Sequence, residues 1–95
     1  MDLADWRKKI DQLDRELVRL LNERARCQME IGKIKRRGGL PIEASSREEK
    51  IFENIRSSNQ GPLDDAALRG VFERILEESK RLQRRLGEAE GAANE

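Results

Sequence analysis

The sequence predicts an all-α protein with one very long, one short and one medium-length helix, which pairs with a second copy of itself. Of the 95 residues, 41% are charged and only 3% are aromatic, a composition typical of long helices and coiled coils. Apolar residues recur every three or four positions over long stretches. Glycine and proline at residues 38–41 and 61–62 divide the chain into three such stretches.

The first expected helix runs from about Leu3 to Arg36 and carries an apolar stripe with one polar intruder, Arg24. The stripe positions are Leu3, Trp6, Ile10, Leu13, Leu17, Leu20, Arg24, Cys27, Ile31 and Ile34. A helix of this length spans about 50 Å. The segment GGLP at residues 38–41 ends it.

The second expected helix begins near Ser46. Ser45 and Ser46 each stand three residues before a glutamate, which is the signature of a capping box. Its apolar side is formed by Ile51, Phe52 and Ile55. We expect it to end by the segment SSNQGP.

The third expected helix runs from about Asp64 to Leu86, and Ser79 is the polar intruder in its stripe. The stripe positions are Leu68, Phe72, Ile75, Ser79, Leu82 and Leu86. Residues 87–95 lack apolar periodicity. We therefore expect a single domain over residues 1–86 and a disordered tail or linker over 87–95.

The long helix is too long to be covered by the rest of its own chain. The other two helices are expected to have only about 12 and 23 residues. An uncovered half of the seam would be a large apolar patch of the kind that soluble monomers avoid. We therefore expect a homodimer in which the long helices pair across a two-fold axis.

Composition also narrows the functional class. The net charge of +1 argues against a nucleic-acid binder. No apolar run approaches the ~18 residues of a membrane span and no signal peptide is visible, so we expect a cytoplasmic location. The single cysteine and the absence of histidine argue against a metal site. Without histidine, the chain also lacks the commonest general base.

Arg24 and Ser79 each have an ordinary interpretation. An arginine in a heptad can set the register or reach the surface, and a serine facing a helix core is common. Lys35, however, follows Arg24 by eleven residues and so shares its face, and Gln83 lies one turn after Ser79. The combination favours a polar site.

The expected site is short of negative charge. Arg47 and Glu48 open the second helix, so together with Arg24 and Lys35 the site has three cations and a single carboxylate. Because a buried cation without a partner is costly, a bound anion would complete the set. Arg7 lies about 25 Å before Arg24 on the same helix, so it reaches the site only from an antiparallel partner.

Three segments carry a resemblance to a known family. They are WRKKIDQLDRELVRLLNERARCQMEIGKIK, GLPIEASSREEKIF and NQGPLDDAALRGVFERILEESKRLQ. Over residues 3–86 the chain resembles the all-helical AroQ class of chorismate mutase. It is most similar to the bacterial mutase domains that are often fused to prephenate dehydratase or to the first enzyme of the shikimate pathway.

The resemblance implies an intertwined homodimer with two identical active sites, and an isomerase of aromatic amino acid biosynthesis that needs no cofactor. The family's site residues match Arg7 (from the partner subunit), Arg24, Lys35, Arg47, Glu48, Ser79 and Gln83. The chain departs from the pattern at Ala44, where some members carry an acidic residue. This departure puts only a supporting contact in doubt.

The implied reaction is the Claisen rearrangement of chorismate to prephenate, in which the enzyme holds the reactive conformer and stabilises developing charge. By the resemblance, Lys35 and Gln83 donate to the ether oxygen of the breaking bond. Glu48 accepts from the ring hydroxyl. The two carboxylates are bound by Arg7 of the partner subunit, Arg24, Arg47 and Ser79.

Two alternatives remain open. An isochorismate–pyruvate lyase has the same fold, although the segment ESKRLQ is more similar to the mutases. The second alternative is a non-catalytic helical dimer that binds metabolites or a partner enzyme. The presence of every charged residue of the predicted site argues against it. The sequence leaves open whether the chain stands alone or belongs to a fusion with another shikimate-pathway enzyme.

Overall fold

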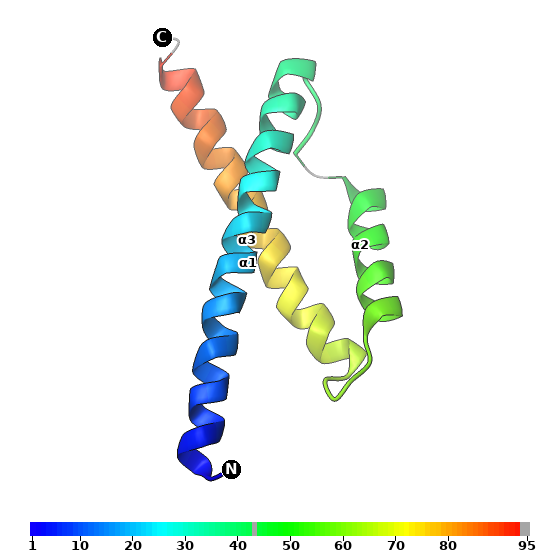
Figure 1. Ribbon diagram of the computed structural model, residues 1–95. Helices are drawn as coiled ribbons and strands as arrows, with labels where there is room; N and C mark the ends of the chain where they lie inside the picture. Colours follow the sequence, from blue (N-terminus) through cyan, green and yellow to red (C-terminus); the bar gives the residue numbers. More distant parts are fainter. Residues whose placement is uncertain (43, 94–95) are drawn as a thin grey trace.

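The computed structural model describes residues 1–42 and 44–93, and these form three α-helices without any strand. Helix α1 covers Leu3–Gly38, α2 covers Ser45–Ser58 and α3 covers Asp65–Ala93 (Figure 1). Their lengths are 36, 14 and 29 residues. The predicted all-α class, with one very long, one short and one medium helix, is therefore confirmed.

Helix α1 is fixed at both ends by local hydrogen bonds. The Asp2 carboxylate accepts from Asp5 N at 2.9 Å, and the Asp5 carboxylate accepts from Asp2 N at 3.0 Å, which closes a capping box. At the other end Gly39 has φ 66°, a left-handed conformation that favours glycine. Leu40 N donates to Lys35 O at 2.8 Å and closes this end of the helix. The helix ends at Gly38, slightly beyond the predicted Arg36.

Helix α2 lacks the predicted capping box. Ser45 already lies inside the helix, and Ala44 takes the extended cap conformation with φ −138° and ψ 96°. Alanine has no side-chain acceptor, so the helix starts only with the backbone bond from Glu48 N to Ala44 O at 3.1 Å. The prediction was wrong because the Ser-x-x-Glu spacing does not determine which residue adopts the cap conformation.

Helix α3 continues to Ala93, whereas the sequence predicted its end at Leu86. Residues 87–93 of the expected tail or linker are therefore helical, and residues 94–95 lie outside the described part; the assignment of this segment as a tail or linker stays a prediction. The side chain of Arg36 runs along this segment, with its Cδ 3.3 Å from where a Cβ on Gly87 would stand, and pairs with Glu90. The domain boundary at residue 86 stays a prediction.

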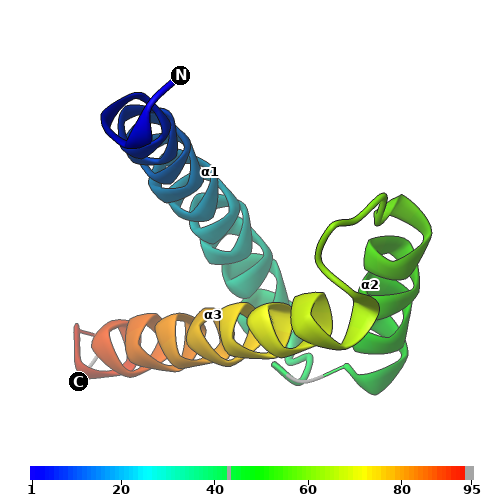
Figure 2. The same ribbon diagram turned by 90° about the horizontal axis from the view of Figure 1, so that it is seen from below.

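The three helices form an open, elongated arrangement in which α3 packs against both α1 and α2. Figure 1 shows α3 crossing α1 near the middle of α3, while α2 lies beside its first half. Seen from below in Figure 2, α1 and α3 diverge on either side of this crossing. The extents are 59 × 28 × 15 Å. Among the described residues, no other helix lies beside the N-terminal half of α1.

Very little apolar surface is buried within one chain. Among the described residues only Ile51 and Leu76 are buried hydrophobic side chains. The apolar stripe along the first half of α1 is instead about half exposed, at Leu3, Trp6, Ile10, Leu13, Leu17 and Leu20. None of the described helices is both long and apolar enough to span a membrane. The predicted seam therefore exists and is not covered by its own chain.

Candidate functional site

The crossing of α1 and α3 brings two of the predicted site residues into contact. Arg24 on α1 donates through Nη1 to Ser79 Oγ on α3 at 3.2 Å. The Ser79 hydroxyl donates its own proton to Ile75 O at 3.0 Å. Its oxygen is therefore left as an acceptor, and this orients the guanidinium. The two polar intruders of the sequence thus form a pair.

One turn further along α3, Gln83 is the only buried polar side chain of the described residues, with 3% of its surface exposed. Its Nε2 donates to Gln28 Oε1 at 2.8 Å, whereas its Oε1 is buried without a hydrogen-bond partner. Sequence reasoning missed Gln28. A signal was present, since Gln28 lies four residues after Arg24 and seven before Lys35, on the face that carries both.

The burial of Gln83 depends on a glycine in the facing helix. Gly32 is the buried residue of α1, and a Cβ at this position would stand 3.3 Å from Gln83 Cγ and 3.1 Å from Arg36 Nη1. Such distances are tighter than most real Cβ contacts. The missing side chain therefore lets α1 and α3 approach closely and packs the stem of Gln83 against the α1 backbone.

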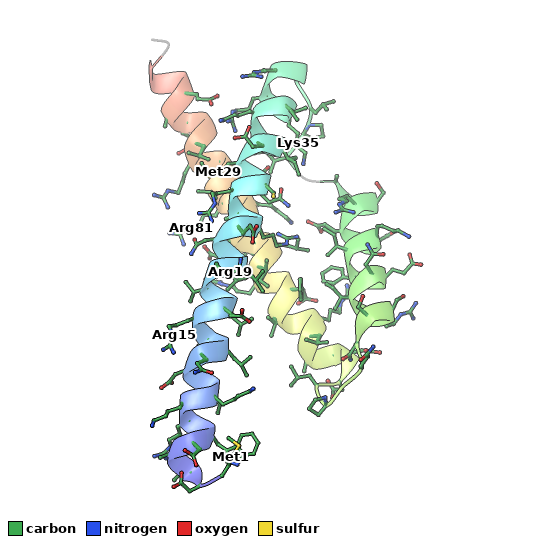
Figure 3. The ribbon with its side chains drawn as sticks, viewed as in Figure 1. Met1, Arg15, Arg19, Met29, Lys35 and Arg81 are labelled. Atoms are coloured by element: carbon green, nitrogen blue, oxygen red, sulfur yellow. The ribbon has the colours of Figure 1, made fainter. Side chains whose placement is uncertain are left out.

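Two further predicted residues are held by partners that the sequence did not indicate. Lys35 donates through Nζ to Ile42 O at 2.8 Å. Figure 3 shows its side chain on the side of α1 that faces the connection to α2. Glu48 on α2 forms a 2.6 Å ion pair with Lys80 on α3. Lys80 directly follows Ser79, so this pair connects α2 to the same stretch of α3.

Charge at the crossing is unbalanced. Burial lowers the pKa of Arg24 from its ordinary value, and the positive charge of Arg47 lowers it further, while Cys27 acts weakly in the opposite direction. Arg47 at the start of α2 is thus near enough to Arg24 for the two cations to repel each other. An anion placed between them would remove this repulsion and offset the cost of burying Arg24.

Arg7 is not brought to the other predicted residues. It lies near the start of α1, about 25 Å along the helix from Arg24. Figure 1 shows this end of α1 well away from the start of α2. Within one chain the predicted set is therefore incomplete.

The side chains of the candidate site have the chemistry to hold an anion and to donate hydrogen bonds. They provide guanidinium and ammonium groups, a hydroxyl and two neutral amides. The described residues contain no group of three or more His, Cys, Asp or Glu side chains that could hold a metal ion. This inventory suits the binding of a dianion and electrostatic stabilisation of developing negative charge.

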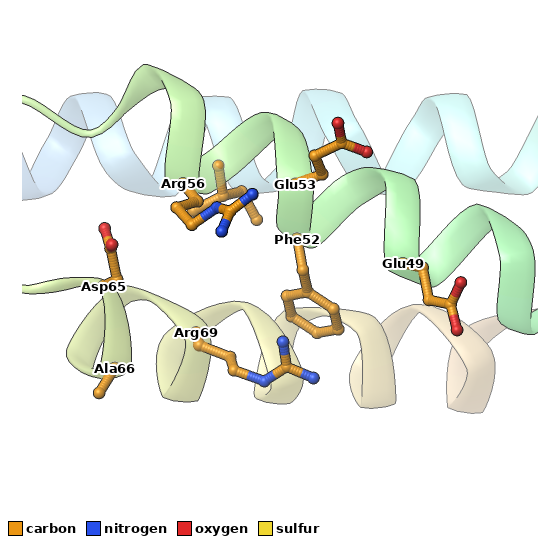
Figure 4. Close-up of a pocket in the computed structure, with 8 residues that line it drawn as sticks. Glu49, Phe52, Glu53, Arg56, Asp65, Ala66 and Arg69 are labelled. Carbon is orange, nitrogen blue, oxygen red and sulfur yellow. The ribbon is translucent and has the colours of Figure 1, made fainter.

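A separate hollow of about 450 Å³ lies between α2 and the start of α3 (Figure 4). It is lined by Glu49, Phe52, Glu53, Ile55, Arg56, Asp65, Ala66 and Arg69. The Arg69 guanidinium stacks 4.1 Å from the centre of the Phe52 ring and pairs with Glu73 at 3.1 Å. None of the predicted site residues lines this hollow, so it is distinct from the candidate site.

Comparison with known proteins was consistent across sequence and structure. A bifunctional chorismate mutase/prephenate dehydratase of Aquifex aeolicus is 37% identical over 89 residues, which is 90% of this chain and 25% of that protein. A chorismate mutase structure from Thermus thermophilus has a TM-score of 0.85 at 36% identity, covering 87% of this chain and 94% of that one.

A third relative carries a ligand. The Helicobacter pylori chorismate mutase, crystallised in complex with prephenate, has a TM-score of 0.81 at 29% identity, over 87% of this chain and 90% of that one. The chain spans about a quarter of the length of the bifunctional relative from Aquifex. The family model described as chorismate mutase type II matches residues 6–84, which include every predicted site residue. With this match over most of its length, the chain belongs to the chorismate mutase type II family.

Proposed function

We propose that the chain is an isomerase that converts chorismate to prephenate. The observation that carries this proposal is the contact at the helix crossing, where the partly buried Arg24 donates to Ser79 Oγ one turn from the buried Gln83. Burial lowers the pKa of Arg24, and the positive charge of Arg47 lowers it further. Chorismate has two carboxylates and would supply the missing negative charge. The prephenate complex of the Helicobacter relative supports the same ligand class.

The carboxylates are assigned to the cationic part of the site. Arg24 is already oriented by its hydrogen bond to Ser79 Oγ, so little side-chain freedom remains to be lost when an anion binds. Arg47 is exposed at the start of α2 and can move onto the ligand from the other side. Glu48 would accept from the ring hydroxyl, which requires its carboxylate to share or leave the contact with Lys80.

The ether oxygen of the breaking bond is assigned to Lys35 and Gln83. Each supplies N–H donors, and negative charge develops on that oxygen in the transition state. Lys35 is now bonded to Ile42 O, and its three donors allow it to keep this contact and add another. Gln83 is buried, which makes its hydrogen bond stronger than it would be in water.

An intertwined homodimer completes the site in this proposal. The apolar face of α1 is half exposed over about its first five turns, and a soluble chain avoids such a surface. A second hollow of about 400 Å³ could receive part of a partner helix; its apolar lining residues are Ile55, Leu68 and Phe72. An antiparallel partner α1 would also bring its Arg7 to the second half of this α1.

Aromatic amino acid biosynthesis in the cytoplasm is the proposed setting, and the name of the Aquifex relative, which couples chorismate mutase to prephenate dehydratase, supports the pathway. In the Aquifex protein the mutase and prephenate dehydratase share one chain. A fused or associated enzyme of the shikimate pathway is therefore the proposed protein partner, in addition to a second copy of this chain.

The test is the loss of chorismate absorbance on addition of purified protein, with prephenate identified in the product. The Lys35→Ala variant is the matched control, and its kcat should fall by roughly 10²–10³-fold, as when one preorganised oxyanion donor is removed. Isochorismate is assayed in parallel. Pyruvate release from isochorismate without any turnover of chorismate would overturn the proposal.

A further inference from the structure

The contact between Gln28 and Gln83 has no role in the function described so far. Gln28 comes from α1 and Gln83 from α3, and the bond of 2.8 Å between their amides is partly buried. Gln83 Oε1 has no hydrogen-bond partner, so Gln28 is the only hydrogen-bond partner of this amide among the described residues. The terminal amide of a nearly fully buried glutamine thus depends on a single contact.

We propose that Gln28 is a positioning residue that fixes the amide orientation of Gln83, an inference that rests on the proposed mutase activity. Gln28 Oε1 takes one of the two N–H groups of Gln83 Nε2. The second N–H remains available for an acceptor-only group such as an ether oxygen. If the amide rotated, its carbonyl oxygen could take the place of the donor and would repel an oxygen that gains negative charge.

The rest of Gln83 is fixed by packing, which leaves only the amide to be controlled. Its Cγ lies against the α1 backbone at Gly32, where a Cβ would stand only 3.3 Å away. The stem therefore has little freedom. The terminal torsion of a glutamine side chain is broad and close to two-fold, so packing alone chooses poorly between the two ends of the amide. A specific acceptor decides between them.

Gln28 is a suitable acceptor because it carries no charge. It stands on the face of α1 that carries Arg24 and Lys35, four residues after the first and seven before the second. Gln28 is neutral, so it offers an acceptor oxygen on this face without repelling a dianionic ligand. A carboxylate there would also accept from Gln83 but would add like charge beside the ligand.

This difference defines a pair of variants. Gln28→Met keeps the length of the side chain and removes the acceptor, so kcat should fall by about 5- to 10-fold, the effect of one hydrogen bond, with KM little changed. Gln28→Glu keeps an acceptor oxygen, so kcat should stay near that of the unmodified chain while KM rises. An unchanged kcat in Gln28→Met would overturn the proposal, as would an equal loss of kcat in both variants.

A double-mutant cycle separates positioning from a direct effect on substrate. If Gln28 acts through Gln83, Gln28→Met should cause no further loss of kcat in a Gln83→Ala background. The same loss in both backgrounds would overturn the proposal. Thermal unfolding of each variant is measured alongside to establish that the fold is retained.

A measurement without substrate distinguishes this proposal from the proposed function. In ¹H–¹⁵N spectra the Gln83 side-chain NH₂, assigned by its loss in Gln83→Ala, should exchange slowly with water in the unmodified protein and faster in Gln28→Met. Unchanged exchange would overturn the positioning role even in an active enzyme. An unmodified chain that does not consume chorismate would instead overturn the proposed function.

Discussion

Arg36 near the end of α1 and Glu90 near the end of α3 form a bidentate ion pair across 54 residues of sequence. The Arg36 Nε and Nη2 atoms donate to the two carboxylate oxygens of Glu90 at 2.8 and 2.9 Å. These hydrogen bonds raise the pKa of Arg36 and lower the pKa of Glu90. The pair connects the C-terminal turns of two helices that diverge from their crossing, and it gives the last turns of α3 a tertiary contact.

Removal of this pair should loosen the last turns of α3 only. In Glu90→Gln, amide hydrogen exchange over residues 87–93 should quicken, while kcat should not change because none of the proposed site residues lies there. Glu88→Gln removes an exposed carboxylate two residues away on the same helix, and it serves as the control. Equal protection in Glu90→Gln and the unmodified chain would contradict the stabilising role of the pair.

The same pair predicts a dependence on pH. Because the pKa of Glu90 in the folded chain lies below its ordinary value of 4.5, its stabilising effect is fully present above pH 4.5. The effect is lost as the pH falls through the lowered value. Exchange protection of residues 87–93 should therefore decrease on acidification, and Glu90→Gln should remove this particular response.

A charge in the apolar stripe of α1 tests the homodimer. Leu17 is 55% exposed in a single chain, so Leu17→Glu would hardly matter to a monomer. In a dimer that pairs the α1 helices it should cause dissociation or unfolding. Sedimentation of the unmodified chain should give about twice its 11.0 kDa mass, and that of Leu17→Glu should not.

Leu63→Glu is the matched control for this substitution, since Leu63 is 56% exposed and lies in the connection before α3. It should leave the sedimentation behaviour unchanged. A monomeric, fully active unmodified chain would contradict both the dimer and the site shared between subunits.

Complementation tests the role of Arg7 across the interface. Arg7→Ala and Arg24→Ala should each be nearly inactive as homodimers. After mixing and refolding at equal amounts, random pairing makes half of the dimers mixed, and each mixed dimer has one intact site of two, so about a quarter of the activity should return. Absence of recovery, with mixed dimers demonstrated, would place Arg7 outside the site.

A carboxyl at position 83 should make catalysis dependent on pH. Gln83 is neutral at every ordinary pH, so the unmodified enzyme should show a kcat that is nearly flat from about pH 5 to 9. In Gln83→Glu only the protonated acid can donate, and burial raises the pKa of a carboxyl above about 4.3. Activity should survive at acidic pH and fall as the pH rises. A pH-independent variant would remove Gln83 from the ether oxygen.

Gly32→Ala should separate stability from activity. Alanine favours a helix over glycine by about 1 kcal/mol, but its Cβ would press on Gln83 Cγ. We expect kcat to fall by about tenfold through displacement of Gln83. Gly70→Ala, where a Cβ meets open space, should gain stability without loss of kcat. Full activity of Gly32→Ala would show that the Gln83 stem tolerates the shift.

Periodicity predicted the helices well, because a stripe of apolar residues depends only on the rise and turn of the backbone. It also singled out Arg24 and Ser79, since both interrupt such stripes, although it did not predict the hydrogen bond between them. Periodicity did not predict the ion pair between Glu48 and Lys80, because charged residues on a helix surface give no pattern that identifies their partner.

The end of α3 shows a second limit of sequence reasoning. The lack of apolar periodicity over residues 87–95 predicted a tail or linker, yet the helix continues to Ala93. Arg36, which packs over Gly87 and pairs with Glu90, comes from a different helix and is far away in sequence. Local propensity cannot register a contact of that kind.

The packing of both other helices on α3 has a consequence for synthesis of the chain. Helix α1 is made first, but its packing partner within the chain is the element made last. The part of α1 that α3 crosses therefore lacks its packing partner within the chain until α3 has been synthesised.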